Sequence, residues 1–209
     1  MEKGLRMRGT GNVESHRDLA ENTRRGTNKS QGLIIAFTGD GKGKTTAAMG
    51  TALRMLGHGK RVAMVQFFKH SALHAPRATE HEKTAWVVDR GSWPGFKVWS
   101  FGGGFTWAVA REENTEMVRK AWKQCCGLLK DPKYSLVILD EIHIALHYKF
   151  LKVSEVVKAL KRKPSGQHVI LTGRSAPRAI IRLADLVTEM KCVKHPFKRG
   201  VCAQPGIEF

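Results

Sequence analysis

The feature that most constrains the fold is a short apolar run followed directly by a glycine-rich loop. Residues 33–37 are continuously apolar, which is typical of a strand covered on both faces of a parallel sheet. Residues 38–43 form the glycine-rich loop, and residues 44–56 have the composition of a helix. Strand, loop and helix in this order are the usual setting of a phosphate-binding loop.

The same alternation of strand and helix continues along the chain. The predicted strands are residues 62–68, 136–139 and 168–171, with shorter candidates at 86–89 and 96–100, and the predicted helices are residues 112–129, 153–161 and 177–183. This order favours an α/β fold with right-handed crossovers. We therefore predict a single-domain P-loop (RecA-like) parallel sheet flanked by helices over residues 32–209. Residues 1–31 are rich in glycine, polar and charged residues and predict a mobile N-terminal arm, with a helix candidate at 14–25.

Composition narrows the classes of function. The 209 residues include 36 Lys+Arg and 18 Asp+Glu, a formal net charge of +18, so acidic small molecules, polyphosphates or nucleic acid are candidate partners. The basic residues are dispersed along the chain, which makes nucleic acid the less favoured partner. No apolar run approaches the roughly 18–20 residues of a membrane span. Four cysteines without a C-x-x-C pair predict neither a zinc site nor a disulfide framework, and we expect a cytoplasmic protein.

The glycine-rich loop has the residues of an anion cradle. Backbone N–H groups of such loops and of helix N-termini surround phosphate oxygens. Lys44 would add a positive charge, and the Thr45 hydroxyl would bind Mg²⁺. The predicted phosphate-binding residues are Gly39, Asp40, Gly41, Lys42, Gly43, Lys44, Thr45 and Thr46. The pattern G-x-x-x-x-G-K-[ST] has glycine where this chain has Thr38, and a surface turn rich in glycine and lysine is the alternative interpretation.

Other predicted strands end in polar residues. Asp140 and Glu141 follow an apolar strand, as do metal-coordinating carboxylates in phosphate-binding proteins; a solvated acidic strand end is the alternative. Gln66 lies near the end of the second predicted strand. Arg174 follows another strand and would clamp a terminal phosphate, or is an exposed arginine at a helix entry. Open α/β folds bind ligands at this edge of the sheet.

Several segments, taken in order, resemble the P-loop ATP:corrinoid adenosyltransferases, also called cob(I)yrinic acid a,c-diamide adenosyltransferases. They are GDGKGKTTAAMGTALRMLGHGKRVAMVQFFK, GFTW, LVILDEIHIAL, VILTGR, ADLVTEM, VKHPF and GVCAQPGIEF. The resemblance covers residues 32–209 apart from 70–100, and the shifted glycine pattern of the loop is this family's own form. His143 departs from the family, in which a small polar residue is expected after the two carboxylates. His143 and His147 are four residues apart, and we favour a polar helix face or a pocket contact over a metal site.

The resemblance implies that ATP acts as an alkylating agent. Co(I) of a reduced corrinoid would attack the ribose 5′ carbon, and inorganic triphosphate would depart. The family pattern implies that Lys44, Arg174 and a Mg²⁺ or Mn²⁺ held by Thr45 and Glu141 stabilise the leaving triphosphate. The corrinoid would be cob(I)alamin, cobinamide or cobyrinic acid a,c-diamide.

The resemblance also gives roles to Phe105 and Trp107. This aromatic pair would occupy the lower face of the corrinoid and exclude the axial ligand of Co(II), which makes the cobalt easier to reduce; core packing is the alternative. The family pattern further implies a homodimer in which the N-terminal arm covers the partner subunit's site. The net charge favours an acidic, flavodoxin-type reductant. A P-loop kinase or NTPase, and a basic RecA-like nucleic-acid-binding ATPase, are the alternative functions.

Overall fold

The structure is a computed structural model that describes residues 31–68, 93–101, 111–202, 204 and 207. These residues lie in the larger of two units of the chain, Gln31–Phe209; the smaller unit is Met1–Ser30. Residues 1–30 of the predicted arm, its helix candidate and the strand candidate at 86–89 therefore lie outside the described residues.

Six parallel strands form one sheet, as the α/β prediction requires. They are β1 (Ile34–Thr38), β2 (Val62–Gln66), β3 (Phe96–Ser100), β4 (Leu136–Asp140), β5 (His168–Thr172) and β6 (Leu186–Glu189). The strand order is β3-β2-β4-β5-β1-β6, and every pairing is parallel. Strand β5 therefore lies between β1, which enters the glycine-rich loop, and β4, which ends in the first of the two carboxylates.

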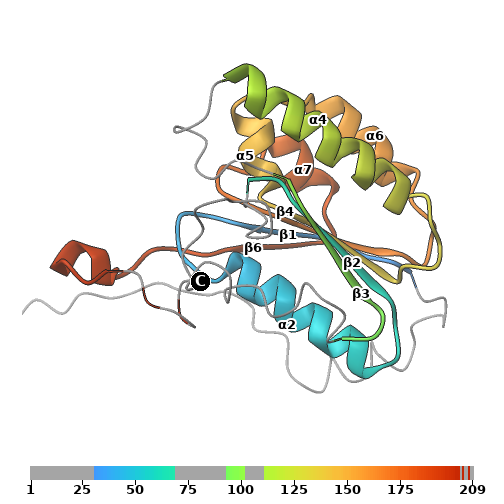
Figure 1. Ribbon diagram of the computed structural model, residues 1–209, viewed down its shortest axis with the longest axis horizontal. Coiled ribbons are helices and arrows are strands. Elements are labelled where there is room, and N and C mark those ends of the chain that lie inside the picture. Colours follow the sequence, from blue (N-terminus) through green and yellow to red (C-terminus); the bar gives the residue numbers. More distant parts are fainter. Residues whose placement is uncertain (1–30, 69–92, 102–110, 203, 205–206, 208–209) are drawn as a thin grey trace, which may run out of the picture. The chain divides into compact units, whose positions relative to one another are not determined.

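Helices cover both faces of this sheet (Figure 1). They are α2 (Lys44–Gly57), α4 (Arg111–Leu128), α5 (Ile142–His147), α6 (Val153–Lys161) and α7 (Arg178–Leu183), followed by the 3-10 helix η2 (Pro196–Arg199). Helix α2 lies on one face, and α4, α5, α6 and α7 lie on the other. None of the helices within the described ranges is long and apolar enough to cross a membrane.

The core explains why the central strands are apolar throughout. In β2, Val62 and Met64 pack in the cluster that includes Ala48 and Ala52 of α2. The alternate residues of β2 pack in the other cluster, with α4, α5, α6 and α7. Because side chains alternate across a strand and both faces are covered, no position of a central strand tolerates a solvated polar side chain except at its ends. Polar residues of the central strands are therefore confined to the strand ends, and those at the carboxyl ends meet at one edge of the sheet.

Three elements differ from the sequence prediction. Strand β6 was not predicted: it is an edge strand of four exposed residues, so it lacks the continuous apolar run of a buried strand. Helix α5 was not predicted as an element, because six residues are too few to show a helical period. Strand β2 ends at Gln66 rather than at residue 68.

Candidate functional site

The carboxyl ends of the central strands bring four polar side chains to one edge of the sheet. Thr38 ends β1, Gln66 ends β2, Asp140 ends β4 and Thr172 ends β5. In the strand register Gln66 lies beside Asp140. All four side chains are at least nine-tenths buried, so each needs a hydrogen-bond partner inside the protein.

The loop between β1 and α2 depends on glycine because β6 approaches it closely. Gly39 and Gly43 have φ values of 94° and 105°, which favour glycine. Gly41 N–H donates to the carbonyl oxygen of Met190, just after β6, at 2.7 Å. A Cβ atom on Gly39 would lie 2.4 Å from that same oxygen. The end of β6 therefore holds the loop, and larger residues at these glycines would force the two apart.

Lys44 begins α2 and turns back into this loop. Its ammonium group donates to the carbonyl oxygens of Gly39 at 2.7 Å and Gly41 at 2.6 Å. Burial lowers the pKa of Lys44, and Arg174 lowers it further, whereas three carboxylates raise it, Glu141 most strongly. Lys44 is thus a partly desolvated cation held by the loop that a phosphate would occupy, with charges of both signs around it.

Asp140 is the centre of a buried hydrogen-bond network. Its Oδ1 accepts from Thr172 Oγ1 at 2.7 Å and from Thr45 Oγ1 at 2.9 Å. Its Oδ2 accepts from Gln66 Nε2 at 3.1 Å, and Gln66 Oε1 accepts from Ser100 Oγ at 3.0 Å. The network connects β3, β2, β4, β5 and α2. It therefore fixes the orientation of the Thr45 hydroxyl at the start of α2.

Glu141 lies next in the chain, in a conformation that side chains rarely adopt. Its φ is 66°, and such left-handed residues cluster at functional sites because the surrounding structure must hold them. Its backbone N–H donates to Thr172 Oγ1 at 2.9 Å. The sharp turn ends β4, begins α5 and places the half-buried Glu141 near enough to Lys44 to raise the pKa of the lysine.

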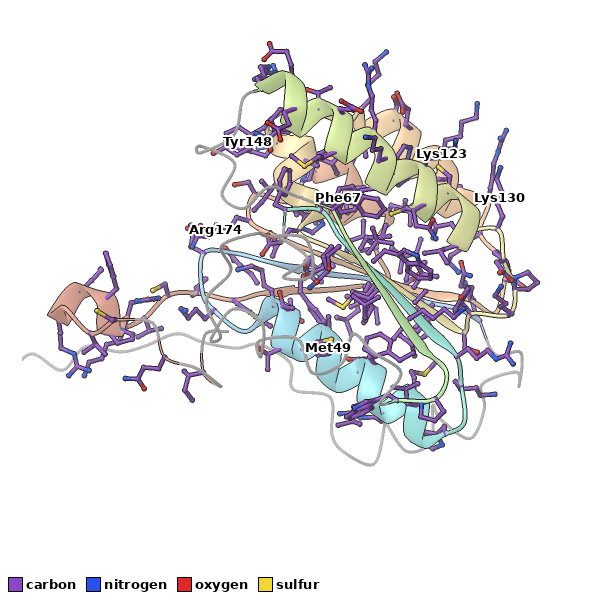
Figure 2. The ribbon with its side chains drawn as sticks, in the orientation of Figure 1. Met49, Phe67, Lys123, Lys130, Tyr148 and Arg174 are labelled. Atoms are coloured by element: carbon purple, nitrogen blue, oxygen red, sulfur yellow. The ribbon has the colours of Figure 1, made fainter. Side chains whose placement is uncertain are left out.

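Arg174 is exposed just after β5. Figure 2 shows it at the end of the sheet where β1 runs into the loop before α2, and its effect on the pKa of Lys44 places it near that residue. Among the described residues nothing forms a hydrogen bond or ion pair with the Arg174 guanidinium. An exposed guanidinium at this position can bind an anion bidentately.

His143 is buried in α5 beside the turn that follows β5. Its Nδ1 lies 3.1 Å from the carbonyl oxygen of Gly173. Since that oxygen only accepts, Nδ1 carries the proton. Burial, and to a smaller extent the charge of Lys44, lowers the pKa of His143 to about 4, although the hydrogen bond with Gly173 acts in the opposite direction. The imidazole is therefore neutral near pH 7.

A metal site at His143 and His147 finds no support in this geometry. His143 is fully buried and His147 is exposed. In the part of the chain that the structure describes, no three His, Cys, Asp or Glu residues form a group that could hold a metal ion. His143 instead contacts the turn that carries Arg174, through the carbonyl oxygen of Gly173.

The structure brings most of the predicted site residues to one place. Residues 39–46 form the loop and the first turn of α2, and Glu141 and Arg174 lie near Lys44. The exposed members of this set are Asp40, Lys42, Gly43, Thr46 and Arg174. Phe105 and Trp107 lie outside the described residues. Sequence reasoning missed Thr172 and the contact made by Thr38; each is the last residue of a strand, and that position was the signal that could have revealed them.

The fold and the site define a class: α/β proteins with a parallel sheet and a glycine-rich loop that begins a helix at the carboxyl edge. Residues 30–209 match the family model described as ATP:corrinoid adenosyltransferase BtuR/CobO/CobP. The chain belongs to this family. The resemblance of the sequence segments is thereby confirmed.

Curated relatives agree with the family match. A corrinoid adenosyltransferase of Sinorhizobium sp is 42% identical over 181 residues, which are 86% of this chain and 81% of the relative. One from Escherichia coli is 40% identical, with 86% of each chain covered. The corrinoid adenosyltransferase CobA of Salmonella typhimurium is also 40% identical, with 87% of each chain covered.

Proposed function

We propose that this protein transfers the 5′-deoxyadenosyl group of ATP to Co(I) of a reduced corrinoid. A Co–C bond forms to the ribose 5′ carbon as the C5′–O bond breaks, and inorganic triphosphate leaves with the electron pair of that bond. Cobalt donates two electrons and becomes Co(III), so no further oxidant or reductant is needed. Family membership and the names of the relatives support this activity. Neither points to a kinase, a general NTPase or a nucleic-acid-binding ATPase.

The observation that carries the proposal is the position of Lys44 in the glycine-rich loop. The attacking atom is the cobalt, so no residue of the protein needs to act as a nucleophile. The task of the protein is to orient ATP and to stabilise negative charge on the departing triphosphate. The ammonium group already lies 2.7 Å and 2.6 Å from two loop carbonyls. Arg174 provides a second positive charge nearby. We assign binding of the triphosphate to residues 39–46 and Arg174, and catalysis to Lys44, Arg174 and Glu141.

Thr45 and Glu141 fit a divalent cation. Hydroxyl and carboxylate oxygens are the donors that Mg²⁺ prefers, and Mg²⁺ commonly binds through one or two protein groups together with substrate phosphates. The Thr45 hydroxyl donates its proton to Asp140, which leaves its lone pairs directed away from that carboxylate. A Mg²⁺ or Mn²⁺ at these residues would supply positive charge to the phosphates.

Further parts of the proposal rest on the family resemblance and on composition. Phe105 and Trp107 would exclude the lower axial ligand of Co(II) in cobalamin, cobinamide or cobyrinic acid a,c-diamide.

The net charge of +18 supports an acidic, flavodoxin-type reductant. Four free cysteines suit the reducing cytoplasm. The proposed homodimer would cover apolar side chains such as Val193 and Phe197, which are 95% and 75% exposed.

The test is an anaerobic reaction of the protein with ATP, Mg²⁺ and chemically generated cob(I)alamin. We expect a light-sensitive Co–C product in the visible spectrum and one equivalent of inorganic triphosphate by ion chromatography. ADP and orthophosphate with an unchanged corrinoid spectrum would contradict the proposal and indicate the kinase or NTPase alternative.

A further inference from the structure

The short segment that carries Arg174, residues 173–176, is attached to the protein at both ends. At its start, the carbonyl oxygen of Gly173 accepts from Nδ1 of His143 at 3.1 Å. At its end, the backbone N–H of Ala176 donates to Thr38 Oγ1 at 3.1 Å. Both side chains come from elements other than the segment itself, β1 and α5. The backbone on each side of Arg174 is thus fixed by a side chain.

Thr38 is suited to this contact by its position. It is the last residue of β1 and is 8% exposed, and its carbonyl oxygen accepts from Met190 N–H at 2.8 Å. The common phosphate-loop pattern has glycine at this position, and glycine has no hydroxyl to offer to Ala176. The departure from the pattern therefore has a structural consequence, because it connects the phosphate loop to the segment with Arg174.

His143 makes the other attachment by both hydrogen bonding and packing. It is completely buried. A Cβ atom on Gly173 would lie 2.9 Å from Cβ of His143, so the two backbones are as close as glycine allows. Within the described residues Nε2 of His143 has no hydrogen-bond partner. The imidazole therefore holds the segment through the hydrogen bond from Nδ1 to the carbonyl oxygen of Gly173.

Between the two attachments the backbone is held in uncommon conformations. Gly173 has φ of 130° and Ser175 has φ of 56°. A non-glycine residue with positive φ costs on the order of 1 kcal/mol or more and persists only when its surroundings hold it. Arg174 lies between these residues, and its guanidinium has no partner within the described part of the protein. Its direction therefore depends on the backbone of the segment.

We propose that Thr38 and His143 are positioning residues that hold residues 173–176 so that Arg174 points at the triphosphate. This inference rests on the proposed function for the identity of the anion. It assigns roles to two residues that do not themselves touch the substrate.

Matched pairs of variants separate the hydrogen bonds from the shapes of the side chains. Thr38→Val removes the hydroxyl and keeps the branched shape, whereas Thr38→Ser keeps the hydroxyl. His143→Leu removes the donor, whereas His143→Asn places an amide N–H near the position of Nδ1. For Thr38→Val and His143→Leu we expect about tenfold weaker binding of inorganic triphosphate with Mg²⁺ by calorimetry, equivalent to about 1.4 kcal/mol. Thr38→Ser and His143→Asn should restore binding to within about threefold of wild type.

A second measurement monitors the hydrogen bond from Ala176 N–H to Thr38 Oγ1 directly. The amide of Ala176 should exchange with solvent faster in Thr38→Val than in Thr38→Ser, as measured by NMR hydrogen exchange. Unchanged exchange would show that the hydroxyl does not hold the segment and would overturn the proposal. Valine is nearly isosteric with threonine, so Thr38→Val should fold. The exchange measurement therefore still tests the proposal if His143→Leu does not fold.

A double-mutant cycle with Arg174→Ala tests whether the two residues act through the arginine. In the Arg174→Ala background, Thr38→Val and His143→Leu should each change triphosphate binding by less than about twofold, because the group that they position is gone. A full tenfold loss in that background, or no loss in the presence of Arg174, would overturn the proposal.

The same experiments distinguish failure of this inference from failure of the proposed function. A wild-type protein that binds triphosphate but does not alkylate cob(I)alamin contradicts the proposed function, while the variants still test the positioning by binding. A wild-type protein that alkylates cob(I)alamin, with Thr38→Val and His143→Leu binding triphosphate as tightly, contradicts the positioning alone. A wild-type protein that neither binds triphosphate nor alkylates cob(I)alamin contradicts both.

Discussion

The hydroxyl of Thr45 donates to Oδ1 of Asp140 at 2.9 Å, which joins the first turn of α2 to the end of β4. These residues are 95 positions apart in the chain. The same carboxylate also accepts from Thr172 and Gln66, so its two oxygens are occupied by protein donors. Asp140 is therefore placed to orient the Thr45 hydroxyl, whereas Glu141 is the carboxylate that we assign to the cation.

Two substitutions of Asp140 should show how much stability depends on its hydrogen bonds and how much on its negative charge. In Asp140→Ala the buried donors of Thr45, Thr172 and Gln66 lose their acceptor, and we expect the free energy of unfolding to fall by about 2–4 kcal/mol. Asp140→Asn should cost less than about 1 kcal/mol, because the Gln66 amide can rotate to accept from the new amide and to donate to Ser100 Oγ. Urea denaturation measures both.

The rotation of Gln66 has its own control. Ser100→Ala removes the donor to Gln66 Oε1 in the wild type, but in the Asp140→Asn background it removes the acceptor of the rotated amide N–H. Because a buried unpaired N–H is tolerated less than an under-satisfied carbonyl oxygen, the substitution should cost more stability in the Asp140→Asn background. Equal costs in the two backgrounds would contradict the rotation.

Lys44→Ala should lower turnover with ATP and cob(I)alamin by at least about 100-fold, as expected for loss of a group that stabilises charge on the leaving triphosphate. The circular dichroism spectrum should stay unchanged, because the lysine packs in a loop rather than in the core. Lys60→Ala, at an exposed position between α2 and β2, is the matched control and should keep turnover within about twofold of wild type. Normal turnover in Lys44→Ala would remove this residue from the mechanism.

Gly173→Ala should destabilise the protein by about 2 kcal/mol or more, because the new methyl group would lie 2.9 Å from Cβ of His143 in a backbone with φ of 130°. Gly50→Ala, in the middle of α2 with no atom of the described residues within 4 Å of the added carbon, should instead stabilise it by about 0.5–1 kcal/mol. Thermal unfolding of the two variants should therefore shift in opposite directions. A stable Gly173→Ala protein would contradict the close packing of His143 on the turn.

Phe105→Ala and Trp107→Ala should slow the reaction that starts from cob(II)alamin and a reductant more than the reaction that starts from cob(I)alamin. The reason is that exclusion of the axial ligand assists reduction of the cobalt and not the alkylation that follows. Rates from the two starting states are compared for each variant. Equal losses from both would indicate that the aromatic side chains only pack.

His168 should make stability depend on pH. Burial lowers its pKa below the ordinary value of 6.5, with a further contribution from Lys163, and Nδ1 accepts from Leu33 N–H at 3.1 Å. As the pH falls below about 6.5, the unfolded chain binds a proton that the folded protein does not, so the free energy of unfolding decreases. His168→Asn keeps an acceptor and does not titrate. Urea denaturation between pH 7 and 5 should show a shallower decrease for this variant, and identical slopes would contradict the prediction.

Much of the fold was predictable because a buried strand appears in the sequence as a short continuous run of apolar residues. The runs at 33–37, 136–139 and 168–171 match β1, β4 and β5 closely, since a strand covered on both faces excludes polar residues. The glycine-rich loop was equally clear. Strand β6 was not, because its residues are exposed at the edge of the sheet, and its pairing with β1 depends on the rest of the sheet.

The candidate site was predicted as a set of residue types and completed only by the tertiary structure. The sequence by itself determined which strands and helices alternate, where the loop lies and that polar residues follow the apolar runs, because these depend on local spacing and burial. It did not determine that Ala176 N–H would reach Thr38 across 138 positions, or that Thr172 would share a carboxylate with Thr45. Those contacts follow from the strand order, in which β5 lies between β1 and β4. That order is decided by the packing of helices on both faces of the sheet, which no local pattern records.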